Sequence, residues 1–425
     1  MPRKFLNVNT YFKLRNLLRN FPFQKQEIEE LQLKKLKKLL IYSYRNFPFY
    51  KDIFDKVKLD PYQIKHINDL KKLPIIDKEK YRDFCYSIVA KNPGVYEKYY
   101  KDGTSGSTGK PLKIYRTWDE RAYMLAKYLR TLFLNGYKIT DRTFCLPSPH
   151  RLADKDSILQ KFGIMKRFSV SYTAEIEEMV DGYIASKADF LYGNKSQLVQ
   201  MASFILENKI EIKQPRFYLC AGEVLDINSK KLIESVFGHG NMFEVYGGVE
   251  FNNLAFQIIG KDYFHFCHDT DILELEENDS TNTKRGNCII TDLHIYSFPL
   301  IRYRLGDLIE TEEKEGLQII KKIQGRLDDW VVLKDGSRLP FHHFYEIMEK
   351  RAEVRQFRFI QETGDLLKVL IVLDKGCKKS GFRANIIKEL KEEISQKMDY
   401  EIIFRDKIPP DESGKLRMVI SKMSK

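Results

Sequence analysis

Short apolar runs alternate with longer helical stretches between residues 135 and 300 of this 425-residue chain. The apolar runs include FCLPS, FLYG, RFYLCAG, MFEVYGG and NCIITDL, and the stretches between them include SQLVQMASFILENK and NSKKLIESVF. Alternation of strands and helices is typical of a layered domain in which helices cover a sheet of mostly parallel strands. The pattern therefore predicts an α/β domain with largely parallel sheets.

Two helices can be placed from local pattern alone. Apolar residues at helical spacing predict a helix over 25–45, which Pro48 stops. A second helix is expected over 118–134, directly after a short strand-like segment, LKIY.

A new series of helical and strand-like segments begins after the segment IQGRLDDWVVLKDGSRLP. Beyond it a helix, strands, another helix and a further strand follow in the manner of a small α+β unit. A chain of this length also suits a large domain with a smaller one. We expect an N-terminal domain over 1–325 and a C-terminal domain over 326–425.

The net charge of +13 does not by itself indicate a nucleic-acid binder, because lysine and arginine are spread along the whole chain. A positive field favours ATP and other anions in a cleft without specifying any of them.

Six cysteines without a C-x-x-C pair indicate reduced thiols in a cytosolic enzyme. The N-terminus has no uninterrupted apolar stretch of a secretory signal, and no apolar run approaches the roughly 18–20 residues of a membrane span. We therefore expect a cytoplasmic protein with no membrane span and no nucleic-acid partner.

A glycine- and hydroxyl-rich segment is the sharpest local motif: Thr104-Ser105-Gly106-Ser107-Thr108-Gly109-Lys110-Pro111. Glycines let backbone N–H groups approach an anion closely, and the hydroxyls and the lysine add donors. The segment is not a Walker A loop, because Thr104 replaces that motif's first glycine and Pro111 replaces the hydroxyl residue that would follow the lysine. A phosphate-holding loop between strands is the interpretation that we adopt over an ordinary hairpin loop.

This loop resembles the phosphate-binding motif of the adenylate-forming superfamily, which includes acyl-CoA ligases, peptide-synthetase adenylation domains and luciferases. Further segments resemble the superfamily's other motifs in the expected order, spanning about 310 residues. They are Tyr246–Glu250 (YGGVE), Tyr303–Asp307 (YRLGD), Gly325–Asp329 (GRLDD) and Ser413-Gly414-Lys415. The segments Pro48-Phe49-Tyr50 and Ala221-Gly222-Glu223 resemble the phenylacetate–CoA ligase-like branch, which includes ligases often encoded in capsule-polysaccharide loci.

The resemblance implies an α/β N-terminal domain, a mobile α+β C-terminal domain, and a reaction that needs ATP, Mg²⁺ and, for this branch, coenzyme A. It also implies residue roles. Lys415 bridges the acyl carboxylate and the α-phosphate, and Glu250 ligates Mg²⁺. Asp328 is the hinge. The phosphate-binding residues are Thr104, Ser105, Gly106, Ser107, Thr108, Gly109 and Lys110, and the adenine- or ribose-binding residues are Gly222, Glu223, Tyr246, Gly247, Asp307 and Arg326.

The chain departs from the family pattern at Val249, where relatives usually carry a hydroxyl residue. Some members of this branch also carry a cysteine-rich metal site after the glutamate motif. Here only the cluster His265-Phe266-Cys267-His268 remains, and ordinary structural roles are favoured for it over a metal site.

Three questions stay open at the level of sequence. The motifs do not identify the carboxylic acid, and they do not decide between coenzyme A, an amine and a carrier-protein thiol as acceptor. A nucleotide-binding regulatory protein descended from a ligase is the alternative outside catalysis. It would be expected to have lost Lys415, Glu250 or Asp307, all of which are present.

Overall fold

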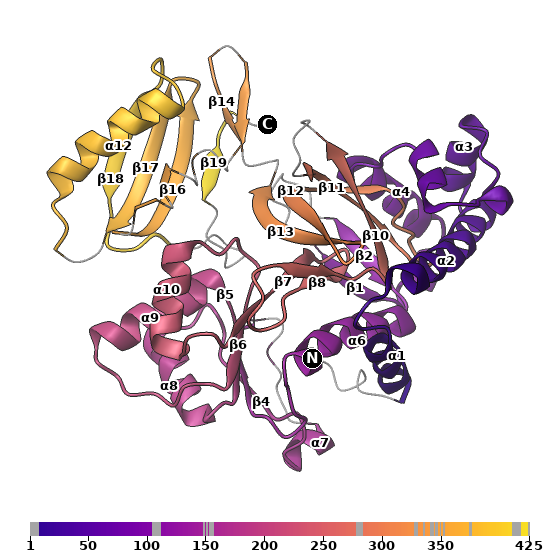
Figure 1. Ribbon diagram of the computed structural model, residues 1–425, viewed down its shortest axis with the longest axis horizontal. Coiled ribbons are helices and arrows are strands. Elements are labelled where there is room, and N and C mark those ends of the chain that lie inside the picture. The colour runs from indigo at the N-terminus through magenta and orange to yellow at the C-terminus, as the bar shows by residue number, and fades with distance from the viewer. Residues whose placement is uncertain are drawn as a thin grey trace. The chain divides into compact units, whose positions relative to one another are not determined.

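The computed structural model (Figure 1) describes most of the chain. The described residues are 8–103, 112–147, 149, 152, 157–277, 284–326, 330–334, 336–340, 344, 347–348, 350–351, 353–373, 376–409 and 418–423. The chain divides into two compact units. The first comprises residues 1–137 and 245–322, and the second comprises residues 138–244 and 323–425.

The first unit begins with helices. They are α1 (Val8–Arg19), α2 (Lys25–Asn46), α3 (Pro48–Lys56), α4 (Lys78–Lys91) and α5 (Pro93–Tyr96), with the short 3₁₀ turns η1 (Pro61–Gln63) and η2 (Ile67–Lys72). The hairpin of β1 (Tyr100–Gly103) and β2 (Lys113–Arg116) and the helix α6 (Trp118–Leu134) follow. The helices expected over 25–45 and 118–134 correspond to α2 and α6.

Helix α6 begins where its sequence provides a cap. The Thr117 side chain accepts from the backbone N–H of Glu120, and the Glu120 carboxylate accepts from the backbone N–H of Thr117. This reciprocal capping box satisfies N–H groups that the first turn would leave unpaired. The start of α6 was therefore predictable from local sequence.

The later part of the first unit is antiparallel. Its strands are β8 (Asn252–Phe256), β9 (Phe264–Phe266), β10 (Asp271–Glu277), β11 (Lys284–Asp292), β12 (Tyr303–Lys314) and β13 (Leu317–Arg326), in the order β10-β11-β12-β13-β9-β8-β7. The expectation of largely parallel sheets up to residue 300 is wrong for this region. Several of these strands are joined by short loops that reverse the chain, whereas a parallel pair needs a long crossover.

The second unit contains the expected parallel sheet. Strands β3 (Thr143–Cys145), β4 (Arg167–Ser169), β5 (Phe190–Asn194), β6 (Phe217–Ala221) and the start of β7 (Met242–Gly248) pair in parallel. The helices between them are α7 (Ile158–Lys161), α8 (Ile176–Ser186), α9 (Lys195–Glu207) and α10 (Ile227–Phe237). Buried side chains of β3, β5 and β6 form one core with those of α8, α9 and α10.

The C-terminal part of this unit forms a smaller sheet. Strands β16 (Val354–Thr363), β17 (Leu366–Leu373), β18 (Asp399–Phe404) and β19 (Val419–Ser421) take the order β18-β17-β16-β19, and α12 (Lys379–Glu393) lies along the sheet (Figure 1). Phe382, Ile386 and Leu390 of α12 belong to the same buried core as residues of β16 and β17. A short hairpin, β14 (Trp330–Val332) with β15 (Arg338–Pro340), precedes it. The chain thus has a large mixed α/β N-terminal part and a smaller α+β C-terminal part, while the boundary between residues 325 and 326 stays a prediction.

Two ion pairs lie fully inside the first unit, both made by α6. The Lys127 Nζ atom is 2.6 Å from Oδ2 of Asp271, and Nη1 of Arg130 is 2.8 Å from both carboxylate oxygens of Asp269. Lys127 and Arg130 are three residues apart, so they lie on one face of the helix. Burial alone raises the pKa of Asp269, but the Arg130 charge more than offsets it, and the pKa falls below its ordinary value. These pairs fix α6 to the segment that leads into β10.

Candidate functional site

The YGGVE segment forms the end of β7 and a tight turn into β8. The turn closes through the backbone N–H of Phe251, which donates to the carbonyl of Gly248. A Cβ atom on Gly247 would lie 1.6 Å from the carbonyl oxygen of Asn252, which is far inside van der Waals contact. The predicted nucleotide-binding residue Gly247 therefore has to be glycine for the turn to close at all.

Glu250 sits in this turn and is buried. Its carboxylate oxygen Oε1 accepts a hydrogen bond of 3.3 Å from the Tyr303 hydroxyl. Nη2 of Arg116, a fully buried residue of β2, donates to the backbone carbonyls of Val249 and Glu250 at 2.6 and 2.5 Å. The backbone and the side chain of Glu250 are thus held by two residues that lie far from it in sequence.

Tyr246 and Asp307 are directly paired. The Tyr246 hydroxyl donates to Oδ2 of Asp307 at 2.8 Å. Burial raises the pKa of Tyr246 well above its ordinary value, so the phenol stays protonated and remains a donor. Two of the predicted nucleotide-binding residues are therefore in contact.

Strand periodicity explains how the YRLGD segment meets the YGGVE segment. Side chains at positions 303, 305 and 307 of β12 share one face, because successive strand residues alternate between faces. Tyr303 meets Glu250, Leu305 lies 3.9 Å from the position that a Cβ atom on Gly248 would take, and Asp307 meets Tyr246. Alternate residues of the two motifs therefore face each other along their length.

Gly222 and Glu223 lie in the second unit, after β6. Gly222 has a φ of +80°, and a Cβ atom there would lie 2.7 Å from Oδ1 of Asn194. The Glu223 carboxylate accepts from the Ser196 hydroxyl at 2.7 Å and from the Ser196 backbone N–H at 3.3 Å. A carboxylate in this position satisfies a free N–H in the first turn of α9. Their local contacts are thus with the start of α9, and their predicted place beside adenine stays a prediction.

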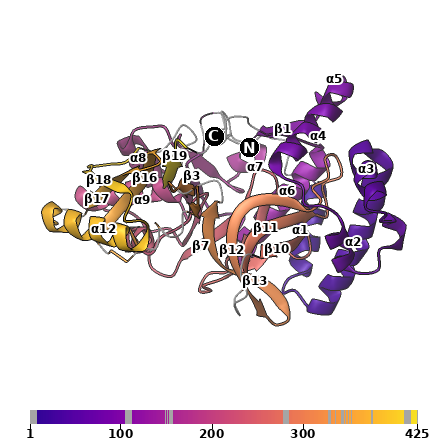
Figure 2. The ribbon, with the colours of Figure 1, turned by 90° about the horizontal axis from the view of Figure 1, so that it is seen from above.

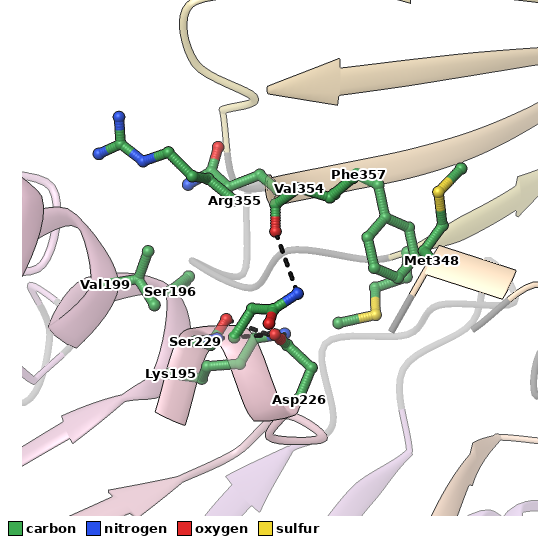
Figure 3. A pocket seen from close by; sticks show the side chains of 12 residues that line it. Lys195, Ser196, Val199, Asp226, Ser229, Met348, Val354, Arg355 and Phe357 are labelled. Atoms are coloured by element: carbon green, nitrogen blue, oxygen red, sulfur yellow. Dashed lines mark hydrogen bonds and ion pairs between the residues drawn. The ribbon is translucent and has the colours of Figure 1, made fainter. Parts of the chain in front are cut away.

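A pocket in the second unit lies beside these residues (Figure 3). One wall holds the buried pair Lys195 and Asp226, whose charged atoms are 3.3 Å apart, and Asn228, which donates to the carbonyl of Val354 at 3.5 Å. The other wall contains the apolar side chains of Met348, Val354, Phe357 and Met418, together with Arg355. The charges of Lys195 and Asp226 neutralise each other, and Arg355, which also lines the pocket, pairs with Glu207 at 3.3 Å.

The remaining predicted site residues lie outside the described part of the chain. These are Thr104, Ser105, Gly106, Ser107, Thr108, Gly109, Lys110, Asp328 and Lys415. Arg326 ends β13, and only its backbone is described.

The His265-Phe266-Cys267-His268 cluster has ordinary structural contacts. Nε2 of His268 is 2.8 Å from the carbonyl oxygen of Gln318, and the His265 ring lies against Phe21 and Tyr263. Cys267 is buried, and burial raises the pKa of its thiol to about 11. Within the ranges that the structure describes, no group of three potential ligands gathers in a way that could hold a metal ion.

His268 makes stability depend on pH. Burial lowers its pKa from 6.5 to about 4, so between these values the unfolded chain binds a proton that the folded chain does not. Stability is therefore expected to fall as the pH drops from 6.5 to 4, with His268 contributing a loss of about 3 kcal/mol at most. Unfolding by urea at pH 7 and pH 4.5 should show a smaller pH-dependent loss for His268→Gln than for the wild type. Equal losses in both proteins would show that His268 does not titrate in this way.

The sequence assigned no role to Arg116 or to Tyr303, although Tyr303 begins the YRLGD segment. Tyr303 could have been found, because it is two and four residues from Leu305 and Asp307 on the same strand face. Arg116 gave no signal, since its role depends on a turn that lies more than a hundred residues away in the chain.

The structure superposes on a 2-hydroxyisobutyryl-CoA ligase, solved in the postadenylation state with 2-HIB-AMP, with a TM-score of 0.75, 16% identity, and coverage of 94% of this chain and 91% of that one. It also superposes on ATP-bound MatB from Rhodopseudomonas palustris, with a TM-score of 0.52 and 14% identity over 74% of this chain and 66% of that one. The fold is thus that of acyl-CoA ligases of the adenylate-forming superfamily.

The chain is also similar in sequence to known proteins. The chain is 24% identical to Protein CapK of Staphylococcus aureus over 93% of this chain and 90% of that protein. It is 31% identical to the phenylacetate-coenzyme A ligase of Escherichia coli over 24% of each protein. Residues 331–422 match the family model of the CapK C-terminal domain. The chain is homologous to CapK and to phenylacetate–CoA ligases, which confirms the predicted resemblance.

No helix in the described ranges combines the length and the apolar character needed to cross a bilayer.

Proposed function

We propose that this protein uses ATP to convert a carboxylic acid to an acyl-adenylate and then transfers the acyl group, with coenzyme A as the expected acceptor. The observation that carries the proposal is the pairing of the YRLGD and YGGVE segments, in which Tyr303 holds Glu250 and Tyr246 holds Asp307. The relatives named as CoA ligases, and the neighbour solved with an acyl-adenylate, support the same reaction class.

In the first half-reaction a carboxylate oxygen attacks the α-phosphorus of ATP. An O–P bond forms, the bond to the β-phosphate oxygen breaks, and pyrophosphate leaves. Charge builds on the phosphoryl oxygens, so fixed donors and cations aimed at them lower the barrier. We assign the β- and γ-phosphates to Thr104–Lys110 and the bridging cation to Lys415.

Glu250 fits a magnesium ligand. Mg²⁺ commonly binds one or two carboxylates together with substrate phosphates, and Glu250 offers a buried carboxylate whose second oxygen lies beside Gly248 rather than a bulky side chain. When bound, the ion would neutralise charge on the phosphate oxygens. Arg116 and Tyr303 hold the position of that carboxylate.

In the second half-reaction the thiol loses its proton and its sulfur attacks the acyl carbonyl carbon, the C–S bond forms, and AMP leaves as the C–O bond breaks. Asp328 is proposed as the pivot about which the C-terminal part moves between the half-reactions. Its place in the GRLDD segment, beside the predicted domain boundary, supports this role.

A pyrophosphate-release assay tests the proposal. Purified protein with ATP and Mg²⁺ is screened against aromatic, fatty and amino acids, and each active acid is then tested with coenzyme A, amines and a carrier protein. We expect acid-dependent release of pyrophosphate and a thioester product with coenzyme A. Product formation with only an amine or a carrier-protein thiol would move the assignment to that acceptor, and nucleotide binding without turnover on any acid would favour the regulatory alternative.

Asp307 should contribute to ATP affinity through the ribose hydroxyls. Hydrogen bonds to a charged group contribute about 1.5–3 kcal/mol, so Asp307→Ala is expected to raise the Kd for ATP by roughly 10- to 100-fold. Tyr246→Phe removes only the bond that orients this carboxylate and should have a smaller effect. Isothermal titration calorimetry measures both variants. A folded Asp307→Ala protein with wild-type ATP affinity would rule out this role.

A further inference from the structure

Helix α1 has two chemically different faces. Its inner residues Thr10, Leu14 and Leu17 are buried, and the helix packs against α6 (Figures 1 and 2). Two residues of its first half also bind α6, because Asn9 and Lys13 contact the Asp119 carboxylate at 2.5 and 3.0 Å. The helix is therefore anchored along its inner side.

The outer face is apolar at one end and basic at the other. Val8, Tyr11 and Phe12 are 71%, 61% and 52% exposed, and the two rings contact each other with centroids 5.8 Å apart. Arg15 and Arg19 follow on the same side and are also exposed. At 3.6 residues per turn, these five residues all fall within about 60° of one direction, opposite the buried stripe.

Single exposed apolar residues are normal on protein surfaces, but a contiguous patch indicates a partner. Three large apolar side chains within little more than one helical turn make such a patch. The sequence of α1, VNTYFKLRNLLR, contains no acidic residue. The face therefore complements a partner that is both apolar and anionic.

We propose that the outer face of α1 binds the interface of an anionic lipid bilayer. Aromatic and aliphatic side chains on one helix face insert at the boundary between headgroups and acyl chains, while basic side chains reach the lipid phosphates. In this arrangement Val8, Tyr11 and Phe12 enter the apolar layer, and Arg15 and Arg19 contact the headgroups. The protein attaches to the surface and does not span it.

Other partners fit this face less well. A second copy paired in parallel on the same face would bring the arginines of two helices together, and like charges repel. An acidic peptide would need a groove, whereas this face is a single docked helix whose apolar side chains project outward. A bilayer accepts projecting side chains without a preformed cavity.

Vesicle co-sedimentation tests the proposal. The wild-type protein is mixed with vesicles of phosphatidylcholine alone or with 30% phosphatidylglycerol, and the lipid concentration at half-binding is measured. We expect half-binding at a lipid concentration at least roughly tenfold lower for the phosphatidylglycerol vesicles. Tyr11→Ser/Phe12→Ser and Arg15→Glu/Arg19→Glu should each weaken that binding by roughly tenfold or more.

Two matched controls separate this face from general charge and general exposure. Lys34→Glu/Lys38→Glu on α2 changes the net charge by the same amount as the arginine variant, at two exposed positions of another helix. Phe162→Ser removes a 78% exposed ring from the second unit. Both controls should bind vesicles nearly as the wild type does, and circular dichroism checks that every variant is folded.

The proposal is overturned if the wild type binds neither vesicle. It is also overturned if the α2 control loses binding as fully as the arginine variant, because the net charge of +13 would then explain the attraction. A wild-type dimer that Tyr11→Ser/Phe12→Ser dissociates, with no vesicle binding, would assign the face to a second copy.

Discussion

Lys415→Ala is expected to slow adenylation by about 10²–10³ while leaving acyl transfer from a supplied acyl-adenylate largely intact. In the proposed mechanism this lysine is a cation that acts on the α-phosphate only while the O–P bond forms. Once the adenylate exists, the lysine has no further part, so the second half-reaction should not need it. Acid-dependent pyrophosphate exchange and thioester formation from synthetic acyl-adenylate measure the two halves separately.

Lys407→Ala provides a matched control for this experiment. Lys407 is an exposed lysine of the same terminal segment, and it lies before the SGK motif. We expect this control to adenylate at the wild-type rate. If Lys415→Ala also adenylates at nearly the wild-type rate, the catalytic assignment of Lys415 fails. The pyrophosphate-release assay with candidate acids and acceptors tests the reaction class separately.

Breaking the buried Arg130–Asp269 pair is expected to have the largest effect on stability. Both side chains are completely buried, Arg130 binds both oxygens of Asp269, and Asn20 donates to Oδ2 of the same carboxylate at 2.9 Å. Arg130→Met leaves the carboxylate buried without its cation. Removing one partner of such a pair typically costs about 3–5 kcal/mol.

The chain provides a reporter for this experiment. Trp118 and Trp330 are its two tryptophans, and Trp118 lies in α6, the helix that also carries Arg130. In a Trp330→Phe background, fluorescence during urea unfolding follows the first unit. The transition should move to clearly lower urea for Arg130→Met.

Two further variants make the result specific. Arg130→Met/Asp269→Leu removes both charges and should recover much of the lost stability, because no unpaired charge stays buried. Lys321→Met breaks the exposed pair with Asp262 and should leave the transition nearly unchanged. A single variant as stable as the wild type, or a double variant no better than the single one, would show that the charge pair does not stabilise this unit.

Much of the local structure was determined by the sequence itself. The helix α2 followed from apolar spacing and Pro48, and α6 begins at a capping box of Thr117 and Glu120; all of these act within a few residues. The parallel strands and helices of the second unit followed from the alternation of short apolar runs with helical stretches. The candidate residues Tyr246, Gly247, Glu250 and Asp307 were also singled out from sequence, because their segments resemble motifs of the adenylate-forming superfamily.

Tertiary structure alone decided the rest. The antiparallel arrangement of β8 to β13 depends on which strands meet and on how short their connections are, and apolar periodicity does not report either property. The partners of Glu250 and Asp307 are set by the way in which one face of β12 lies against the β7–β8 turn. Nothing in the local sequence indicates that the cations Arg116, Lys127 and Arg130 are buried. The fold places backbone carbonyls beside Arg116 and carboxylates beside Lys127 and Arg130, and these partners make the burial of the three cations possible.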